Sequence, residues 1–292
     1  MTDLDSFQHH RPVLMALAYR MLGDVARAED IVQDAWVRWQ TTDTSIDNPK
    51  AFLVTMVMRL CLNTLDSAQA RREVSRGDQL PEPVSLADAG IARVDALDRI
   101  SMAFLVLLQR LTPAERAVLL LHEVFDFSHA EIAPLVGKNE TACRQLLKRA
   151  REQVSSERRS LTVSPDVHRR LLRAFMRAAA AGDLTELTKL LADDAVLVVD
   201  PGSTGGTYGR VRNLPGPLVG AVKIASFVAA VAPQGATGLA TRECELNGQP
   251  AVLVLRDGQP YTAILLSVAG DRITGVFMHA DAARLRHVGP VD

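Results

Sequence analysis

The stretch Asn139–Arg151, NETACRQLLKRAR, decides how the rest of the chain is interpreted. Asn139 is a good N-cap residue, and neither Pro nor Gly interrupts the run that follows. Apolar side chains recur at helical spacing, at Cys143, Leu146, Leu147 and Ala150. The other side is polar and mostly cationic, with Thr141, Arg144, Gln145, Lys148, Arg149 and Arg151. The stretch therefore predicts a helix with one buried side and one cationic side.

Two interpretations of this helix are open. It is either a solvated surface helix or a helix for the major groove of DNA, where Arg and Lys contact phosphates and Arg or Gln read base edges. The residues before it favour DNA binding. Ala133, Gly137 and Cys143 have the spacing of a helix-turn-helix, in which Gly takes the left-handed turn. Pro134 should kink or shorten the first helix, predicted over 128–136.

Composition sets broad limits. The chain has 292 residues, 48% hydrophobic and 23% charged, which is typical of packed globular domains. The formal net charge is −1, so the chain as a whole does not look like a nucleic-acid binder. Basic charge is local, however, because 138–159 holds seven Lys or Arg against three Glu.

The three cysteines, Cys61, Cys143 and Cys244, are odd in number and far apart. They are interpreted as buried thiols in a reducing compartment, with no disulfide and no metal site. The sequence has no signal-peptide pattern and no long apolar run, so a cytoplasmic protein with no membrane association is expected. His122-Glu123 begins like a zinc-protease motif, but Asp126 stands where the second His is required. No cofactor is predicted.

The predicted first domain, 1–72, is all-helical. A helix over 6–22 ends at Gly23, and Asp24 caps a second helix that presents a polar outer side of Asp30, Gln33, Asp34 and Arg38. Asn48-Pro49 then opens a long helix toward Arg72, with Asn48 as the N-cap residue. Its polar positions include Arg59, Asn63, Arg71 and Arg72. A solvated helix face is the simplest interpretation of each polar set.

Four further segments follow. Residues 73–98 are rich in Pro, Gly and acidic residues and are interpreted as a linker. Residues 99–155 form a second all-helical domain, in which Thr112 with Glu115 and Ser128 with Glu131 predict two capping boxes. A short linker at 156–165 precedes a third domain.

The third domain, 166–292, has an α+β pattern. Helices are expected at 166–181, 183–192 and 218–231, and a short strand at 196–200. Alternating strands near 237–246, 250–256, 260–268 and 272–279 are joined by hairpin turns such as Asn247-Gly248. We expect a curled antiparallel sheet with a concave face.

The first two domains resemble the extracytoplasmic-function class of bacterial RNA polymerase sigma factors. The resemblance is carried by Phe7–Trp39, Asn48–Arg72 and Leu111–Arg151, in this order. It implies that Asp30, Gln33, Asp34 and Arg38 face core RNA polymerase at the β′ clamp helices. It implies that Asn48, Arg59, Asn63, Arg71 and Arg72 contact the −10 element. The cationic side of Asn139–Arg151 would read the −35 element of promoter DNA, with region 4 near the polymerase β flap.

The third domain resembles SnoaL-like domains of the NTF2-like fold, which one branch of these sigma factors carries at the C-terminus. That branch has a Trp-Leu-Pro-Glu-Pro linker motif, and here Gln79 precedes Leu80, Pro81, Glu82 and Pro83. Its Asp-Gly-Gly-Gly-Lys motif corresponds to a longer stretch at 200–206 without the Lys. The resemblance implies a C-terminal domain that regulates the sigma factor in cis through this linker.

Strand ends of the third domain carry the candidate pocket residues Asp200, His279 and Asp281. They would face an unknown small ligand, and an Asp general base is how related cyclases and isomerases work. An Asp at a strand end is more often a capping residue, so the chain is not expected to be an enzyme. Two alternatives to a sigma factor stay open: a ligand-sensing helix-turn-helix regulator, and a cyclase or isomerase fused to a DNA-binding module.

Overall fold

The computed structural model describes residues 3–42, 46–70, 80–86, 89–91, 101–155, 163–200, 214, 216–235 and 238–289. The chain forms two compact units. Unit 1 comprises residues 1–77, 89–98 and 105–156, and unit 2 comprises 78–88, 99–104 and 157–292. Within the described part of the chain, no helix is both long and apolar enough to cross a membrane.

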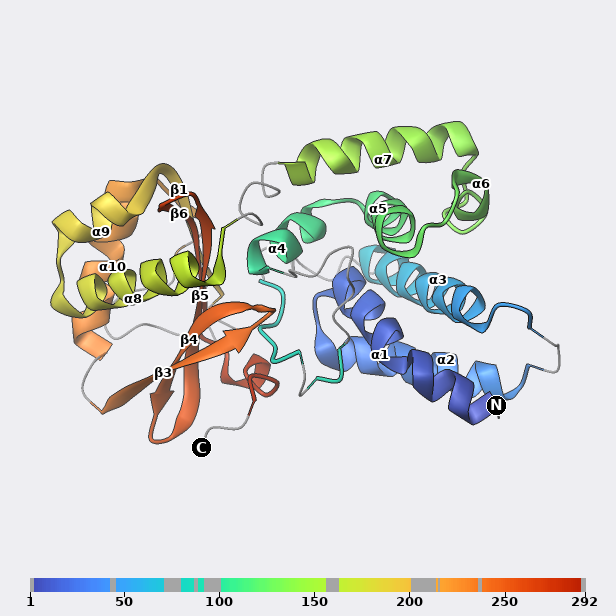
Figure 1. The fold of residues 1–292 in the computed structure, drawn as a ribbon, viewed down its shortest axis with the longest axis horizontal. Helices are drawn as coiled ribbons and strands as arrows, with labels where there is room; N and C mark the ends of the chain where they lie inside the picture. The colour runs from blue at the N-terminus through green and yellow to red at the C-terminus, as the bar shows by residue number, and fades with distance from the viewer. Residues whose placement is uncertain are drawn as a thin grey trace. The chain divides into compact units, whose positions relative to one another are not determined.

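Unit 1 begins with three packed helices, α1 (Asp3–Leu22), α2 (Val25–Gln40) and α3 (Pro49–Ala70) (Figure 1). Gly23 ends α1 with a φ of 71°, as predicted. The carboxylate of Asp24 accepts a hydrogen bond from the Arg27 amide, and the Asn48 side chain accepts one from Ala51. Both predicted N-caps are therefore present.

The long helix α3 is buried on more than one side. Leu53, Val57 and Cys61 are enclosed, and so are Val54 and Met58. The reason is that α3 packs against α1 and α2 and also against α5 (Pro113–Phe125). A helix with neighbours on two sides buries more than one stripe.

The second group of helices in the chain is α4 (Met102–Arg110), α5, α6 (His129–Ile132) and α7 (Glu140–Val154). Both predicted capping boxes are confirmed, one at the start of α5 and one at the start of α6. The first helix of the helix-turn-helix, predicted over 128–136, ends earlier than those bounds, because α6 ends at Ile132, and the predicted shortening at Pro134 is confirmed. Pro134 has no amide hydrogen to continue the ladder, and tighter turns follow, with Leu135 bonding to the Ile132 carbonyl.

The C-terminal part of unit 2 is an α+β domain around a six-stranded sheet in the order β2-β1-β6-β5-β4-β3. The strands are β1 (Leu191–Asp200), β2 (Leu218–Val219), β3 (Leu239–Leu246), β4 (Gln249–Arg256), β5 (Gln259–Ala269) and β6 (Arg272–His279). Three helices pack on the sheet: α8 (Pro165–Ala181), α9 (Leu184–Leu190) and α10 (Ala221–Gly235) (Figure 1). Their shared core includes Phe175 of α8, Ile224 of α10 and alternate residues of β5 such as Ile264 and Leu266. Helices that pack on one sheet form the α+β domain that the sequence predicted.

Three details of this domain differ from expectation. The predicted helix 183–192 ends at Leu190, because Leu191 is already extended and pairs with Ile273. The predicted helix 218–231 begins only at Ala221, since Leu218 pairs with Leu197 as a strand and Gly220 has a φ of 106°. The sheet is also not wholly antiparallel, because β1 runs parallel to β6.

Candidate functional site

The helix-turn-helix of α6 and α7 has the predicted geometry. Asn139 caps α7 by accepting a hydrogen bond from the Ala142 amide at 2.8 Å. Gly137 has a φ of 63°, which provides the left-handed turn. The apolar side of α7 is buried, at Cys143, Leu146, Leu147, Ala150 and Val154. All six predicted DNA-contacting side chains are exposed, at Thr141, Arg144, Gln145, Lys148, Arg149 and Arg151.

The cations of α7 fall into two groups. Arg149 lies 3.3 Å from the Glu115 carboxylate of α5, and Arg151 is ion-paired with Glu123 of α5. Among the described residues, Arg144 pairs only with Glu140, within the same helix and in solvent. Lys148 is similar, with Glu152 at 4.0 Å. Because exposed pairs of this kind are weak, the charges of Arg144 and Lys148 are available to an anion.

Arg116 lies on α5, the helix against which α7 packs. Its side chain is 3% exposed and donates to the carbonyl of Met21, to the Gln109 side chain at 3.0 Å and to the Leu111 carbonyl at 3.3 Å. Burial lowers the pKa of Arg116 to about 10, so the guanidinium still carries its charge at neutral pH. A buried cation that bonds three acceptors orients α5, and α7 packs on α5.

The predicted polymerase-facing residues, Asp30, Gln33, Asp34 and Arg38, are all exposed on α2. They lie opposite the buried stripe of that helix, which includes Ile31, Val32 and Ala35. The predicted −10 residues Asn48, Arg59 and Asn63 are exposed along α3. Arg71 and Arg72 lie outside the described residues.

The linker motif Leu80–Pro83 is buried within unit 2, as part of an extended segment. Two backbone groups of Val84 are bonded by Asn247: the Asn247 side chain accepts from the Val84 amide at 3.2 Å, and the Asn247 amide donates to the Val84 carbonyl at 2.8 Å. The Ser85 amide donates to the His287 carbonyl at 2.7 Å. His287 Nδ1 also lies 3.1 Å from the carboxylate of Glu82, which is 2% exposed.

A second contact holds the start of α4. The Gln249 side-chain oxygen accepts from the Met102 amide at 3.1 Å, and its nitrogen donates to the Leu266 carbonyl at 3.0 Å. Asn247 and Gln249 flank the same hairpin turn between β3 and β4. The sequence pattern places Asn247 in that turn, and no pattern singles out Gln249 or His287. Asn247 has a positive φ, as expected for a turn residue, but the residue that its side chain bonds, Val84, lies 163 positions away in the sequence.

The three strand-end residues Asp200, His279 and Asp281 serve the fold of this domain. Asp200 is 1% exposed and ion-paired with Arg284 at 2.5 Å. Asp281 caps a short 3-10 helix, Ala282–Arg284, by accepting from the Ala283 amide. Burial and, less strongly, the charge of Arg284 lower the pKa of His279 to about 3, so this ring is neutral.

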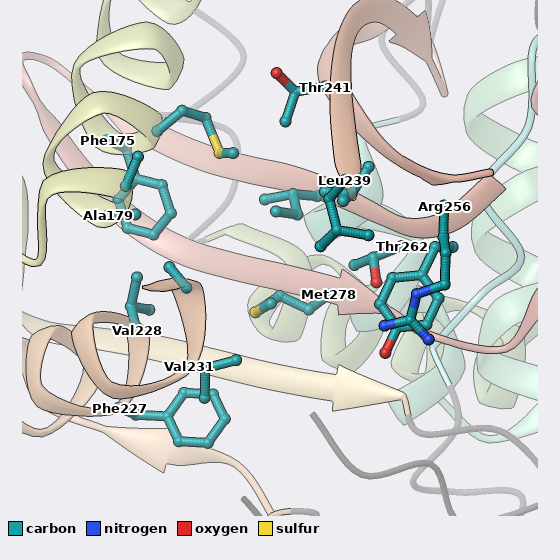
Figure 2. Close-up of a pocket in the computed structure, with 16 residues that line it drawn as sticks. Phe175, Ala179, Phe227, Val228, Val231, Leu239, Thr241, Arg256, Thr262 and Met278 are labelled. Atoms are coloured by element: carbon teal, nitrogen blue, oxygen red, sulfur yellow. The ribbon is translucent and has the colours of Figure 1, made fainter. Parts of the chain in front are cut away.

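The domain has a partly open cavity elsewhere, between α8 and α10 on one side and the sheet on the other, with a volume of about 240 Å³. Figure 2 shows Phe175 and Ala179 of α8 and Phe227 and Val228 of α10 around one end. None of the three strand-end residues lines it. The sequence does not reveal these lining residues, because apolar positions of a helix have the same pattern whether they face a core or a cavity.

Comparison with known proteins decides the family. The sequence profile of Sigma-70 region 2 matches residues 6–71, and that of Sigma-70, region 4 matches residues 101–154. The chain is 37% identical over 274 residues to the extracytoplasmic-function RNA polymerase sigma factor SigJ of Mycobacterium tuberculosis, a match that spans 92% of this chain and 84% of SigJ. The chain belongs to the extracytoplasmic-function RNA polymerase sigma factors.

Two further likenesses extend over most of the chain. The probable sigma factor SigI of Mycobacterium tuberculosis is 34% identical over 281 residues, with 93% of this chain and 90% of SigI covered. The crystal structure of SigJ superposes with a TM-score of 0.75 at 29% identity, over 99% of this chain and all of that chain. The predicted sigma-factor family is therefore confirmed. The region 2 match contains α1 to α3, and the region 4 match contains α4 to α7.

Proposed function

We propose that this sigma factor binds core RNA polymerase through residues 5–72, opens the −10 element with α3, and reads the −35 element with α7. The observation that carries the proposal is the exposed cationic face of α7 in a helix-turn-helix, within a chain of this family. Such a protein would act in the cytoplasm, where polymerase and promoter DNA are.

At the −35 element, Arg144, Gln145 and Lys148 are the principal readers in this proposal. Arg and Gln side chains form paired hydrogen bonds with base edges, and Lys contacts phosphates. Thr141 lies near the N-terminus of α7, where a phosphate is also favoured by the helix dipole. Arg149 and Arg151 are tied to α5, so we assign them a supporting role at the phosphate backbone.

At the polymerase, the exposed polar side of α2 is the proposed contact, through Asp30, Gln33, Asp34 and Arg38. At the −10 element, Asn48, Arg59 and Asn63 have the exposure and chemistry for a single strand, which favours cations and hydrogen-bonding groups. Arg71 and Arg72 follow α3 in the sequence and stay part of the proposal.

We further propose that the C-terminal domain regulates the sigma factor in cis by holding the linker. The support is a set of contacts to main-chain atoms: Asn247 on Val84, His287 on Ser85 and Gln249 on Met102. Hydrogen bonds to the linker backbone fix its path whatever its side chains are. When one domain holds the linker, the linker allows only a limited range of distances between regions 2 and 4.

We assign the C-terminal domain no catalytic role. Asp200 is held by a buried ion pair, and His279 is neutral and enclosed, so neither is placed as a general base for a bound substrate.

Reconstitution tests the sigma function directly. The purified chain is added to core polymerase, and we expect it to co-elute with the enzyme. The double variant Asp30→Lys and Asp34→Lys should weaken co-elution. Asp166→Lys, at an exposed acid of α8, is the matched control and should not. A chain that never associates with core polymerase contradicts the proposal.

The regulatory part has its own pair of variants. Asn247→Gly keeps a turn residue that accepts positive φ but removes the side chain that bonds Val84. Asp257→Gly makes the same change in the next hairpin, where Asp257 also has a φ of 52°. Transcript yield with core polymerase should change for Asn247→Gly and stay constant for Asp257→Gly. Equal yields for both would remove the regulatory role of the linker contact while leaving sigma function intact.

A further inference from the structure

The cavity of the C-terminal domain is apolar at one end and polar at the other. Phe175 and Phe227 mark the apolar end, and Arg256 and Thr262 lie together at the opposite end in Figure 2. No Asp or Glu is among the residues that line it. The cavity therefore has a long axis with different chemistry at its two ends.

A β-bulge builds the polar end. Val254 of β4 pairs with Thr262 of β5, but the next residue, Leu255, pairs with Pro260. Tyr261 is the extra residue on β5. In a regular strand, neighbouring side chains point to opposite faces, whereas a bulge re-aims one of them. Here Tyr261 and Thr262 both line the cavity although they are adjacent in sequence.

Two polar groups at this end lack a protein acceptor. The Thr262 hydroxyl lies on a residue that is 2% exposed, and it has no hydrogen-bond partner among the described residues. The Arg256 guanidinium lies 3.8 Å from the centre of the Tyr261 ring. In the part of the chain that the structure describes, Arg256 forms no ion pair with a carboxylate. A buried hydroxyl without a partner is costly, and it points to a missing ligand atom.

We propose that this cavity binds a small apolar molecule that carries one carboxylate at its end. The carboxylate accepts hydrogen bonds from the Thr262 hydroxyl and from Arg256, whose orientation is set by stacking on Tyr261. The apolar part lies between the phenyl rings of Phe175 and Phe227. A volume of 240 Å³ is that of roughly eight water molecules, so the ligand has on the order of ten non-hydrogen atoms.

Isothermal titration calorimetry on the full chain tests the proposal with octanoate as the probe. 1-Octanol and octylamine have the same chain length but a neutral or a cationic head group. We expect octanoate to bind with one-to-one stoichiometry, and at least about tenfold more tightly than either comparison molecule, because a charge-assisted hydrogen bond distinguishes them.

Variants at the polar end separate the site from adventitious binding. Arg256→Gln should weaken octanoate binding at least about tenfold and leave the affinity for 1-octanol unchanged. Thr262→Val, which keeps the shape and removes the hydroxyl, should weaken octanoate about threefold or more. Arg169→Gln, at an exposed cation of α8 outside the cavity, is the matched control and should have no effect.

Three results would overturn the proposal: no binding of octanoate, equal affinity for octylamine, or unchanged octanoate affinity in Arg256→Gln. The measurement needs neither polymerase nor DNA. Its outcome is therefore independent of the function proposed above for regions 2 and 4.

Discussion

Arg149 and Arg151 lie within two turns of Arg144 and Lys148 on the same helix, yet their surroundings differ. The first two are ion-paired with acids of α5, Glu115 and Glu123. Among the described residues, the other two pair only within α7, in solvent. Two cations of α7 thus attach the helix to its own domain, and two offer charge to a partner.

The C-terminal domain repeats this difference with single arginines. Arg284 is mostly buried and ion-paired with Asp200. Arg256 is exposed, stacks on Tyr261 and has no carboxylate partner among the described residues. In both units, an arginine that is already paired serves the fold, and an arginine without a buried partner is the candidate for binding.

The largest expected effect is on stability, at the buried pair. Asp200→Asn removes the charge that compensates Arg284 and keeps the shape of the side chain. We expect the free energy of unfolding to fall by about 3 kcal/mol, because a charge left without its buried partner is costly. Urea unfolding measures this change. Arg256→Gln should alter it by less than about 0.5 kcal/mol, and a loss of similar size in both variants would remove the distinction.

The next effect is on promoter binding. The double variant Arg144→Ala and Lys148→Ala should weaken binding of the polymerase complex to promoter DNA on the order of thirtyfold, because it removes one base-reading and one phosphate-contacting cation. Titration at several salt concentrations measures affinity and salt slope together. The slope should also become shallower by about one. Unchanged affinity and slope would show that Arg144 and Lys148 do not face DNA.

A smaller effect concerns pH and His279. Its pKa is about 3 in the folded chain, below the usual value, so the unfolded chain takes up a proton first as the pH falls. Stability from the neutral ring is complete above pH 6.5 and is lost toward pH 3. Between pH 6.5 and pH 5.5 the loss should be about 1 kcal/mol.

His279→Phe keeps a buried ring without the titrating group. Urea unfolding of this variant at the two pH values should show a smaller loss than the parent chain. An identical pH dependence in both proteins would assign it to other groups.

The smallest effect is expected at Arg149 and Arg151, which are paired with acids of α5. Arg149→Gln with Arg151→Gln should reduce the free energy of unfolding by less than about 1 kcal/mol per pair, because exposed ion pairs contribute little. Promoter affinity in the polymerase complex should stay within about threefold of the parent chain, since these cations are already occupied. A loss as large as that of the Arg144 and Lys148 variant would contradict the division of the α7 cations into two groups.

Much of the helical unit was predictable because its signals are local. The caps at Asp24, Asn48 and Asn139 each involve residues three positions apart. The buried and exposed sides of α7 follow from helical spacing alone. The shortening of α6 at Pro134 was expected from the sequence, but the predicted end at residue 136 lies four residues beyond Ile132.

The features that sequence patterns did not predict are formed by contacts between distant parts of the chain. The partner of Asn247 is Val84, and the bulge at Tyr261 exists only in the pairing of β4 with β5. The parallel pairing of β1 with β6 likewise joins strands far apart in sequence. The cavity was missed for the same reason, since its lining comes from two helices and four strands.

Transcription start-site mapping with purified core polymerase tests the central claim most directly. The full chain is compared with the Arg144 and Lys148 double variant and with the Arg149 and Arg151 double variant on the same genomic DNA fragments. We predict start sites that share −35 and −10 sequences, which are lost or weakened with the first variant and retained with the second. No start sites above those of core polymerase alone would contradict the assignment of this chain as a promoter-specificity subunit.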